Sequence, residues 1–403
     1  MSRIEKNIPN QWQSEKFGDI FDFLSTATFS RNSLSLEDEG VGVFNIHYGD
    51  IHSTFSTSIL DCNKEKLPAI IDEKVDINKL TFLQDGDLII ADASEDYEGV
   101  GKSAEIINVK DKLVTAGLHT FAVRDKSGLT TNHFRSYLLK HPWVENELKK
   151  LATGSKVYGV SKTNITDLEL VLPPIKEQKK IAQILSTWDE LIEKQTKLIE
   201  AKEKQKKGLM QRLLTGELRF PGFDEEWEEK KLGDIFIINA GKDLNVKYFS
   251  KIQSDEFNFP VYSNKLTSDG LYGFYRTSDY SGGKITVTAR GMLGYSNPRF
   301  EDFMAIGRLL VLTPKVKLDI TYVSEFINNM IEVFIESTGV PQLTAPQFSI
   351  YKIRLPKFKE QRKIASLLSE ADKEIELLKK ELTRFKEQKK GLMQQLLTGK
   401  IRV

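Results

Sequence analysis

The sequence LPPIKEQKKIAQILSTWDELIEKQTKLIEAKEKQKKGLMQRLLTGELRF at residues 172–220 occurs again, in altered form, as LPKFKEQRKIASLLSEADKEIELLKKELTRFKEQKKGLMQQLLTGKIRV at residues 355–403. The two stretches align without a gap, and roughly half of their positions are identical. A shorter match precedes each copy, WQSEKFGDIF at residues 12–21 and WEEKKLGDIF at residues 227–236. Solenoid proteins repeat about every 20–50 residues, and this period is much longer. The repeated order of short motif, variable segment and long motif therefore predicts a duplicated domain.

Each long motif is predicted to form a long amphipathic helix. Proline precedes each one, at a position where the missing N–H is not needed. Glu177 and Glu360 then fall in the first turn, where negative charge suits the helix dipole. Apolar residues recur with a heptad-like spacing, which is typical of a coiled-coil seam. The seam residues expected to pair the helices or to contact a partner are Ile181, Leu185, Trp188, Ile192, Ile364, Leu368, Ile375 and Leu382.

Four positions depart from an ideal helical seam. Gln195 and Lys202 interrupt the apolar pattern of the first helix, so we expect its middle to pack more loosely. Gly208 and Gly391 each lower the helix propensity by about 1 kcal/mol. We interpret these two glycines as close-packing points, or as residues of the last turn before the helix stops at Thr-Gly.

The two helices are predicted to pack on each other. About 37 helical residues would span roughly 55 Å, and a single helix of this kind is unstable alone in water. Antiparallel pairing would place one variable domain at each end of the pair and give the chain a pseudo-twofold arrangement. The alternative is that each helix packs only on its own domain.

The variable segments are predicted to be mixed α/β domains, because short apolar runs alternate with turn residues. The expected strands lie within residues 41–49, 86–94, 102–109, 119–124, 259–264, 282–290 and 308–314, and the expected helices at 132–152 and 319–336. The fold class is therefore α+β, with two mixed α/β domains separated by two long helices paired as an antiparallel coiled coil. The expected divisions are a first domain at 1–171, a central helical region at 172–220, a second domain at 221–354 and a C-terminal helical region at 355–403.

The composition narrows the range of functions. The chain has 403 residues, of which 40% are apolar and 29% charged. It lacks a run of about 18 apolar residues, and its start lacks the apolar segment of a secretory signal. Cys62 is the single cysteine, which fits a reducing compartment such as the cytoplasm. The net charge is +1, so a nucleic-acid contact would need locally arranged basic residues or a partner that supplies them.

The pattern KxGDI, a variable segment, LPxxKEQxKIAxxLS and a long helix closing in LLTG resembles the specificity subunit of type I restriction–modification enzymes. The pattern occurs twice and covers essentially the whole chain. The resemblance implies two target-recognition domains that each read one half of a split, asymmetric site in double-stranded DNA. It also implies that the helices hold these domains apart and bind two modification (methyltransferase) subunits. Two restriction subunits with ATP-driven translocase activity can join such complexes.

The resemblance also implies a cytoplasmic subunit that performs no chemistry itself. S-adenosylmethionine, ATP and Mg²⁺ are then expected on partner subunits, and no cofactor on this chain. If the two domains read opposite halves of a site on one face of B-DNA, they should sit near a whole helical turn apart, about 34–36 Å or a multiple of it. The helix length would then act as a ruler for the unread spacer.

Two loops are candidates for DNA contact, because base reading needs polar side chains on loops and cations for phosphate. The loop at 93–103 offers glycines for close backbone approach, a tyrosine and two phosphate ligands, namely Tyr97, Gly99, Lys102 and Ser103. The loop at 289–300 offers Arg290, which suits guanine, together with Gly291, Tyr295, Asn297 and Arg299. Tyr262, Ser263 and Asn264 form a further polar turn. The alternative is that both loops are ordinary connections between strands.

No residue of the sequence is a candidate for catalysis or metal binding. Residues 99–103, GVGKS, lack the first glycine of a nucleotide-binding P-loop, since Asp96 stands there. His47 and His52 have no cysteine nearby and are expected to be surface or hydrogen-bonded histidines. Residues 296–299, SNPR, lack the second proline and the aromatic residue of an amino-methylation motif. The competing hypotheses are a self-contained enzyme, such as a nuclease with duplicated domains, and a structural coiled-coil adaptor without a nucleic-acid role.

Overall fold

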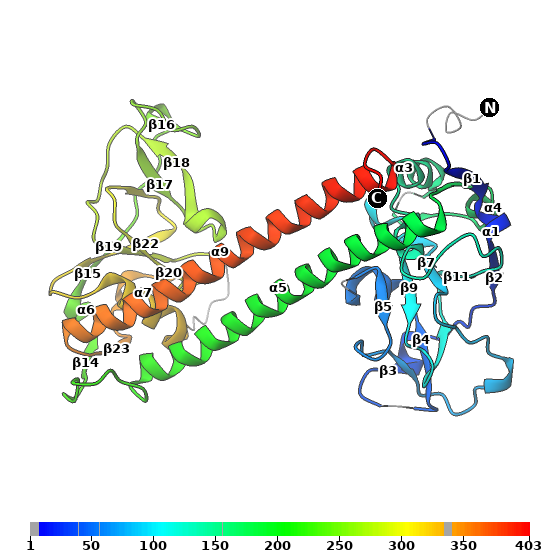
Figure 1. The fold of residues 1–403 in the computed structure, drawn as a ribbon. Coiled ribbons are helices and arrows are strands. Elements are labelled where there is room, and N and C mark those ends of the chain that lie inside the picture. The colour runs from blue at the N-terminus through cyan, green and yellow to red at the C-terminus, as the bar shows by residue number, and fades with distance from the viewer. Residues whose placement is uncertain (1–7, 39, 56, 155, 334–340) are drawn as a thin grey trace. The chain divides into compact units, whose positions relative to one another are not determined.

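The computed structural model describes residues 8–38, 40–55, 57–154, 156–333 and 341–403. It divides into two compact units, the first made of Met1–Lys197 with Lys380–Val403 and the second of Leu198–Lys379. Each unit therefore contains one variable segment together with one part of each long helix (Figure 1).

The first unit is built on a five-stranded sheet with the order β2-β11-β7-β9-β5. Its strands are, in that order, Phe21–Leu24, Thr120–Asp125, Leu88–Ala91, Ser103–Ile107 and Ile59–Asp61. Strands β5 and β9 are parallel, and the other neighbours are antiparallel. All four residues of β7 are buried, which explains why this strand reads in the sequence as a continuous apolar run.

A second sheet of the first unit has the order β10-β4-β6-β3, and β10 and β4 are parallel. Its strands are Leu113–Ala116, Val43–Ile46, Ala69–Ile70 and Leu34–Ser35. Two small ladders pair β1 (Gln13–Lys16) with β13 (Glu169–Leu172) and β8 (Ala93–Ser94) with β12 (Tyr158–Gly159). The short helices are α1 (Phe17–Ile20), α2 (Arg135–Leu138), α3 (Pro142–Leu151) and α4 (Lys162–Thr166).

The second unit has two four-stranded sheets. One has the order β15-β22-β19-β20, formed by Phe236–Ala240, Leu309–Pro314, Lys284–Thr288 and Ser296–Arg299. The other has the order β16-β18-β17-β21, formed by Phe249–Ser250, Leu271–Tyr275, Phe259–Tyr262 and Met304–Ala305. A small ladder pairs β14 (Glu228–Lys231) with β23 (Lys352–Leu355), and the short helices are α6 (Leu232–Ile235), α7 (Ile320–Met330) and α8 (Ala345–Ser349).

The two units share one topology, although their variable segments share little sequence. The order β2-β11-β7-β9 matches β15-β22-β19-β20, with every neighbouring pair antiparallel in both. The order β10-β4-β6-β3 matches β21-β17-β18-β16, and the one parallel pair falls at the same place in each. Within the described residues, strand β5 extends the sheet of the first unit and has no counterpart in the second. The duplication predicted from the motifs therefore includes the variable segments themselves.

All of the predicted strands form, at β4, β7, β8, β9, β11, β17, β19 and β22. The helix predicted at 132–152 is instead two helices, α2 and α3, because Pro142 begins the second one. The residue before a proline avoids the helical conformation, and His141 accordingly has φ −59° and ψ 128°. The helix predicted at 319–336 is α7, which ends at Met330. Residues 334–336 of that prediction lie outside the described residues.

The long motifs form α5 (Ile175–Thr215) and α9 (Phe358–Leu397), of 41 and 40 residues. In Figure 1 the beginning of α5, in green, lies beside the last turns of α9, in red. In the first unit, Leu185 of α5 joins the same buried core as Leu396 of α9. In the second unit, Leu368 of α9 joins the same buried core as Leu213 of α5. Since the start of each helix packs with the end of the other, the pair is antiparallel, as predicted.

The interpretation of Gly208 and Gly391 is wrong. Both lie inside continuous helices that run past them for at least six further residues, so neither is in a last turn. A Cβ atom added to either glycine would meet nothing within 4 Å, so neither is a close-packing point within the chain. Both positions are exposed.

Candidate nucleic-acid interface

The first turn of α5 is bound by the last residues of the chain. Glu177 accepts hydrogen bonds from Nε and Nη2 of Arg402 at 2.7 and 2.9 Å and from Nε1 of Trp12 at 3.0 Å. Burial alone would raise the pKa of Glu177, but the hydrogen bonds from Arg402 and Trp12 outweigh it and hold that pKa below its ordinary value. We call this set of three residues the first clasp.

The second unit contains the same clasp with the roles of the two helices exchanged. Glu360, in the first turn of α9, accepts hydrogen bonds from Nε and Nη2 of Arg219 at 3.0 and 2.8 Å and from Nε1 of Trp227 at 3.3 Å. Arg219 follows α5, just as Arg402 follows α9. In each unit, the end of one long motif therefore binds the start of the other.

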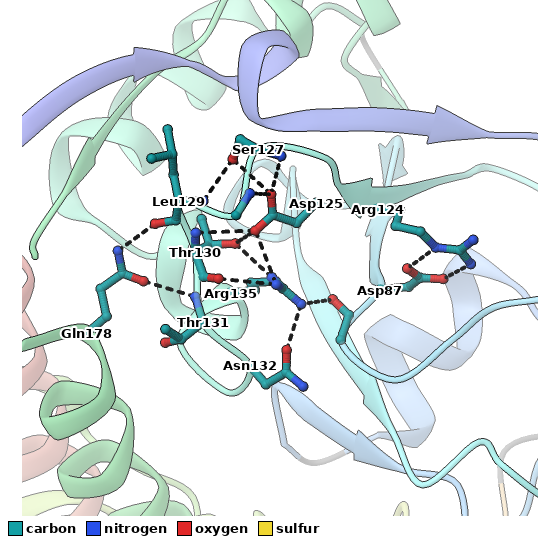
Figure 2. A network of polar contacts seen from close by, with 12 residues as sticks. Asp87, Arg124, Asp125, Ser127, Leu129, Thr130, Thr131, Asn132, Arg135 and Gln178 are labelled. Atoms are coloured by element: carbon teal, nitrogen blue, oxygen red, sulfur yellow. Dashed lines mark hydrogen bonds and ion pairs between the residues drawn. The ribbon is translucent and has the colours of Figure 1, made fainter. Parts of the chain in front are cut away.

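A repeated glutamine attaches each variable domain to its long helix. Figure 2 shows Gln178 of α5 accepting from the backbone N–H of Thr131 at 3.0 Å and donating to the carbonyl of Leu129 at 2.8 Å. Its side chain also donates to the Pro173 carbonyl. In α9, the equivalent Gln361 accepts from the backbone N–H of Asp319 at 2.9 Å and donates to the Pro356 carbonyl at 2.8 Å. The KEQ triplet of each motif thus connects helix and domain.

The loop that Gln178 contacts has its own, partly buried network of hydrogen bonds. Arg135 donates to Asp125, to Thr130 and to Asn132 at 3.1, 2.7 and 2.9 Å (Figure 2). Burial would raise the pKa of Asp125, but hydrogen bonds from Thr130, Ser127 and Gly128 lower it overall. This satisfied network fixes the position of the domain surface that meets α5.

The predicted seam residues lie along the helix pair. Ile181, Leu185, Ile364 and Leu368 are fully buried, Ile375 is buried, and Trp188, Ile192 and Leu382 are half-buried. Trp188 meets Phe385 of α9 edge to face, with ring centroids 6.2 Å apart. Gln195 is buried and donates to Glu381 at 3.1 Å, and Lys202 forms an ion pair with Glu374 at 2.6 Å. The two polar interruptions of the seam therefore have partners on the opposite helix.

The loop predicted to contact DNA in the first unit joins β7 to β9 and is anchored along its length. Its strand β8 pairs with β12. The Tyr97 hydroxyl donates to the Lys149 carbonyl at 2.6 Å, and the ring of Tyr97 packs edge to face on Tyr158, although the residue as a whole is 43% exposed. Lys102 is exposed and donates to the His52 carbonyl at 2.9 Å. Gly99 is half-buried, and Ser103 is buried at the start of β9.

The loop predicted in the second unit joins β19 to β20, which are the equivalents of β7 and β9. Arg290, Gly291 and Tyr295 are exposed in this loop, and Asn297 is half-buried on β20. Arg290 donates to the Gln342 side chain at 3.3 Å. Arg299 is 4% exposed and donates to Thr286 at 2.9 Å.

The polar turn at 262–264 packs against the loop at 289–300. Tyr262 is 8% exposed and lies beneath the Arg299 guanidinium, 3.5 Å from the ring centroid. Ser263 is buried against Gly270. Asn264 is half-buried and donates to the Arg290 carbonyl at 2.8 Å. Tyr262, Ser263 and Arg299 therefore have partners inside the protein, whereas Arg290, Gly291 and Tyr295 face solvent.

In each unit, the loop predicted to contact DNA lies against a segment from the other sheet of that unit. This segment follows β4 in the first unit and β17 in the second. In the first unit, His52 follows β4 and its Nε2 lies 3.0 Å from the Ala93 carbonyl. In the second unit, Asn264 follows β17 and contacts Arg290. Because β4 and β17 are equivalent strands, the same pair of loops comes together twice. The sequence predicted both members of this pair in the second unit, but only the hairpin loop in the first.

The clasps were also missed by the sequence interpretation, although a signal for them existed. Glu177 and Glu360 were assigned to the helix dipole alone. The arginine near the end of each long motif and the tryptophan that opens each short motif are identical in both copies. Identity between two copies that otherwise differ at about half of their positions was the available signal, but it does not reveal which residues meet.

The fold and these loop pairs define a duplicated protein, in which two α/β domains of one topology share an antiparallel helix pair. The family model for the type I restriction modification DNA specificity domain matches residues 9–203 and 224–387. The chain belongs to this family, whose role is DNA sequence specificity. The predicted resemblance is therefore confirmed.

Individual relatives agree with the family assignment. The chain is 26% identical to the type I restriction enzyme MjaVIII specificity subunit of Methanocaldococcus jannaschii. The match covers 98% of this chain and 94% of that relative. The fold is similar to the type I restriction-modification S subunit of M. genitalium, with a TM-score of 0.59, 17% identity and 96% of each chain covered. It is also similar to a chain from a structure concerning complex assembly and conformational transition of the type I R-M system. There the TM-score is 0.56 with 15% identity, and 98% of this chain and 99% of that chain are covered.

Within the residues that the structure describes, none of the helices combines the length and the apolar character that crossing a bilayer requires. In the same part of the chain, His, Cys, Asp and Glu side chains do not gather in groups of three or more that could hold a metal ion.

Proposed function

We propose that this chain is the DNA-reading subunit of a type I restriction–modification complex, and that each α/β domain reads one half of a bipartite, asymmetric site. The observation that carries this proposal is the shared topology of the two units combined with different residues on their equivalent loops. Identical catalytic domains would be expected to keep the same chemical groups at equivalent positions. Two domains that recognise different half-sites are expected to keep the same fold and to differ in the residues of their DNA-contacting loops.

The helix pair is proposed to bind two modification subunits and to set the unread spacer. Outside the clasps and seams, Lys, Glu and Gln side chains cover both helices, and many of them face solvent. Restriction subunits would join through the same complex. S-adenosylmethionine, ATP and Mg²⁺ would then act on the partner subunits, and this chain would perform no chemistry of its own in the cytoplasm.

Methylation mapping tests the proposed reading role. The chain is co-expressed with its modification subunit, and methylated bases are mapped across the host genome. The expected result is one bipartite site with an unread spacer of constant length. Methylation without sequence preference, or no methylation, would contradict the proposal and favour a structural coiled-coil adaptor.

Exchanging residues 237–354 for the same region of another specificity subunit tests the modular assignment. Only one half of the methylated site should change, because the clasps and the other domain remain intact. A change in both halves would contradict the assignment of one half-site to each domain.

DNA binding by the complex should weaken steeply with salt, because phosphate contacts release counterions. An adaptor without a nucleic-acid role would show no such dependence. Turnover of DNA by the purified chain alone, in the presence of Mg²⁺ and S-adenosylmethionine, would instead favour a self-contained enzyme.

A further inference from the structure

A polar groove lies in the first unit, between the segment after β4 and the hairpin loop after β7. It has a volume of about 450 Å³, and its lining includes Tyr48, His52, Ser94, Glu95, Asp96 and Lys102. The segment after β4 contains a π-helical turn at Asp50–Thr54. Such turns are rare in proteins, and those that occur often lie at functional sites. The amino-acid sequence alone did not predict a function for this segment.

The walls of the groove are held firmly in place. Asp50 accepts from the backbone N–H of His47 at 2.9 Å and from Arg31 at 3.2 Å, which ties down the π-helical turn. His52 contacts the Ala93 carbonyl, and Lys102 crosses the groove to the His52 carbonyl. These contacts connect the two walls directly.

Gly99 shows how closely the walls approach each other. A Cβ atom at this position would lie 2.4 Å from Oγ of Ser94 and 3.0 Å from Cε1 of His52. The glycine that was predicted to allow close approach to DNA therefore packs closely against side chains of the protein itself. The groove is preorganised, which favours selective binding.

Several polar groups of the groove are left available for a ligand. In the described part of the chain, the exposed Glu95 carboxylate has no hydrogen-bond or ion-pair partner, and the Tyr48 hydroxyl has none either. The Tyr48 ring is nevertheless oriented, because His52 and His119 pack edge to face against it with ring centroids 6.1 and 5.4 Å away.

The charges of the groove favour a base edge over a phosphate. Glu95, Asp96 and Glu98 all line it, and three carboxylates would repel a phosphate group. An ionised carboxylate only accepts hydrogen bonds, and in the major groove of DNA the amino groups of cytosine and adenine are donors. The Tyr48 hydroxyl can donate to a neighbouring acceptor on the same edge.

We infer that this groove reads a base pair of the half-site recognised by the first domain, with Glu95 accepting from the exocyclic amino group of cytosine or adenine. Tyr48 donates to the adjoining acceptor on the same base edge. This inference rests on the proposed function and adds to it the residues and the kind of base edge that the first domain recognises.

The test compares two variants with a matched control, each co-expressed with the modification subunit. Glu95→Gln replaces an acceptor by an amide that also donates, and Tyr48→Phe removes one hydroxyl and keeps the ring. Glu37→Gln is the control, because Glu37 is an exposed carboxylate of the same unit that does not line the groove and is paired with Lys66 at 3.3 Å. Genome methylation is mapped for each, and methylation rates are measured on the cognate duplex and on duplexes with single base substitutions.

The expected result for Glu95→Gln and Tyr48→Phe is loss of discrimination by about tenfold at one base pair of one half-site. The other half-site and the spacer length should not change, and the Glu37→Gln control should methylate the same site with the same discrimination as wild type. The inference is overturned if wild type and both variants methylate the same site with the same discrimination, or if both halves lose discrimination equally. Absence of sequence-specific methylation by the wild-type complex would overturn the proposed function itself, and this inference with it.

Discussion

At the scale of single residues, the arrangement depends on two buried carboxylates that bind a distant part of the chain. Glu177 and Glu360 are both almost inaccessible to solvent, and each has an arginine and a tryptophan as partners. Each arginine also lies over its tryptophan, at 5.6 Å for Arg402 and Trp12 and 5.8 Å for Arg219 and Trp227. Buried carboxylates are expensive unless paired, so the clasps select one way of joining the helix ends.

Glu177→Gln should loosen the first clasp without disturbing the second. The amide keeps the shape of the side chain but loses the charge that strengthens its hydrogen bonds to Arg402 and Trp12. We expect a loss of about 1–3 kcal/mol in local stability. Hydrogen exchange should become faster at β1 and in the first turn of α5, and Glu360→Gln should produce the corresponding change at β14 and the first turn of α9. Equal acceleration in both units by either variant would contradict independent clasps.

A different buried carboxylate should make the first unit dependent on pH. Glu105 of β9 accepts from the backbone N–H groups of His133 and Ser136 at 2.5 and 2.9 Å. Burial raises its pKa to about 7, above the value of 4.5 for an exposed glutamate, although these hydrogen bonds oppose the shift. Between these two values the folded chain binds more protons than the unfolded chain, so the contribution of Glu105 to stability falls as pH rises from about 4.5 to about 7.

Urea unfolding of wild type and Glu105→Gln checks this dependence. The variant should be less stable, because its amide places a donor against a backbone donor. Its deficit should shrink from about pH 5 to about pH 8, because only the wild type loses stability across that range. A deficit that stays constant with pH would contradict the raised pKa.

At the scale of elements, the helices were the most predictable part of the molecule. Seam residues such as Leu185 and Leu368 alternate with charged residues over many turns, and both are fully buried. The strands were also predictable from short apolar runs. Their pairing was not, because β2 and β11, for example, are neighbours in the sheet but about a hundred residues apart in sequence.

The candidate site was only partly predictable, for a related physical reason. Arg290 and Arg299 are both candidates for DNA contact in the sequence, yet the first faces solvent and the second is buried against Thr286 and Tyr262. The type of a residue limits what it can bind, whereas the direction of its side chain depends on strand register. The segment containing Tyr48 and His52 was missed because its partner loop is distant in the sequence.

Gly208→Ala and Gly391→Ala should stabilise the helix pair. Both glycines are exposed within helices, and an added Cβ atom would meet nothing within 4 Å. Alanine has a higher helix propensity, so we expect a gain of about 1 kcal/mol for each substitution, measured as a higher thermal midpoint of the isolated chain. Gly399→Ala is the contrasting variant, because Gly399 has φ +67° and its Cβ atom would lie 2.3 Å from Pro9. Destabilisation by Gly208→Ala or Gly391→Ala would mean that the helices need glycine there.

At the scale of the whole molecule, the two units share the same fold and the same contacts with the helices, but they differ in their loops. The clasps, the glutamines of the KEQ triplets and the sheet orders are equivalent in the two units. The loops that meet at β4 and at β17 differ in sequence and in contacts. Under the proposed function, changes in the loops would alter what one domain reads while the packing of the domain on its helix stays the same.

Lengthening both helices together tests the proposed ruler. Seven residues of heptad pattern are inserted where the compact units divide each helix, after Lys197 in α5 and after Lys379 in α9. Seven residues make about two turns, so the seam continues in register, and each helix grows by roughly 10.5 Å. At about 3.4 Å per base pair, the unread spacer should lengthen by roughly three base pairs while both half-sites stay the same. Insertion into α5 alone should break the seam and lower the yield of methylating complex. An unchanged spacer in the paired variant, with methylation retained, would show that helix length does not set the spacing and that the ruler proposal is wrong.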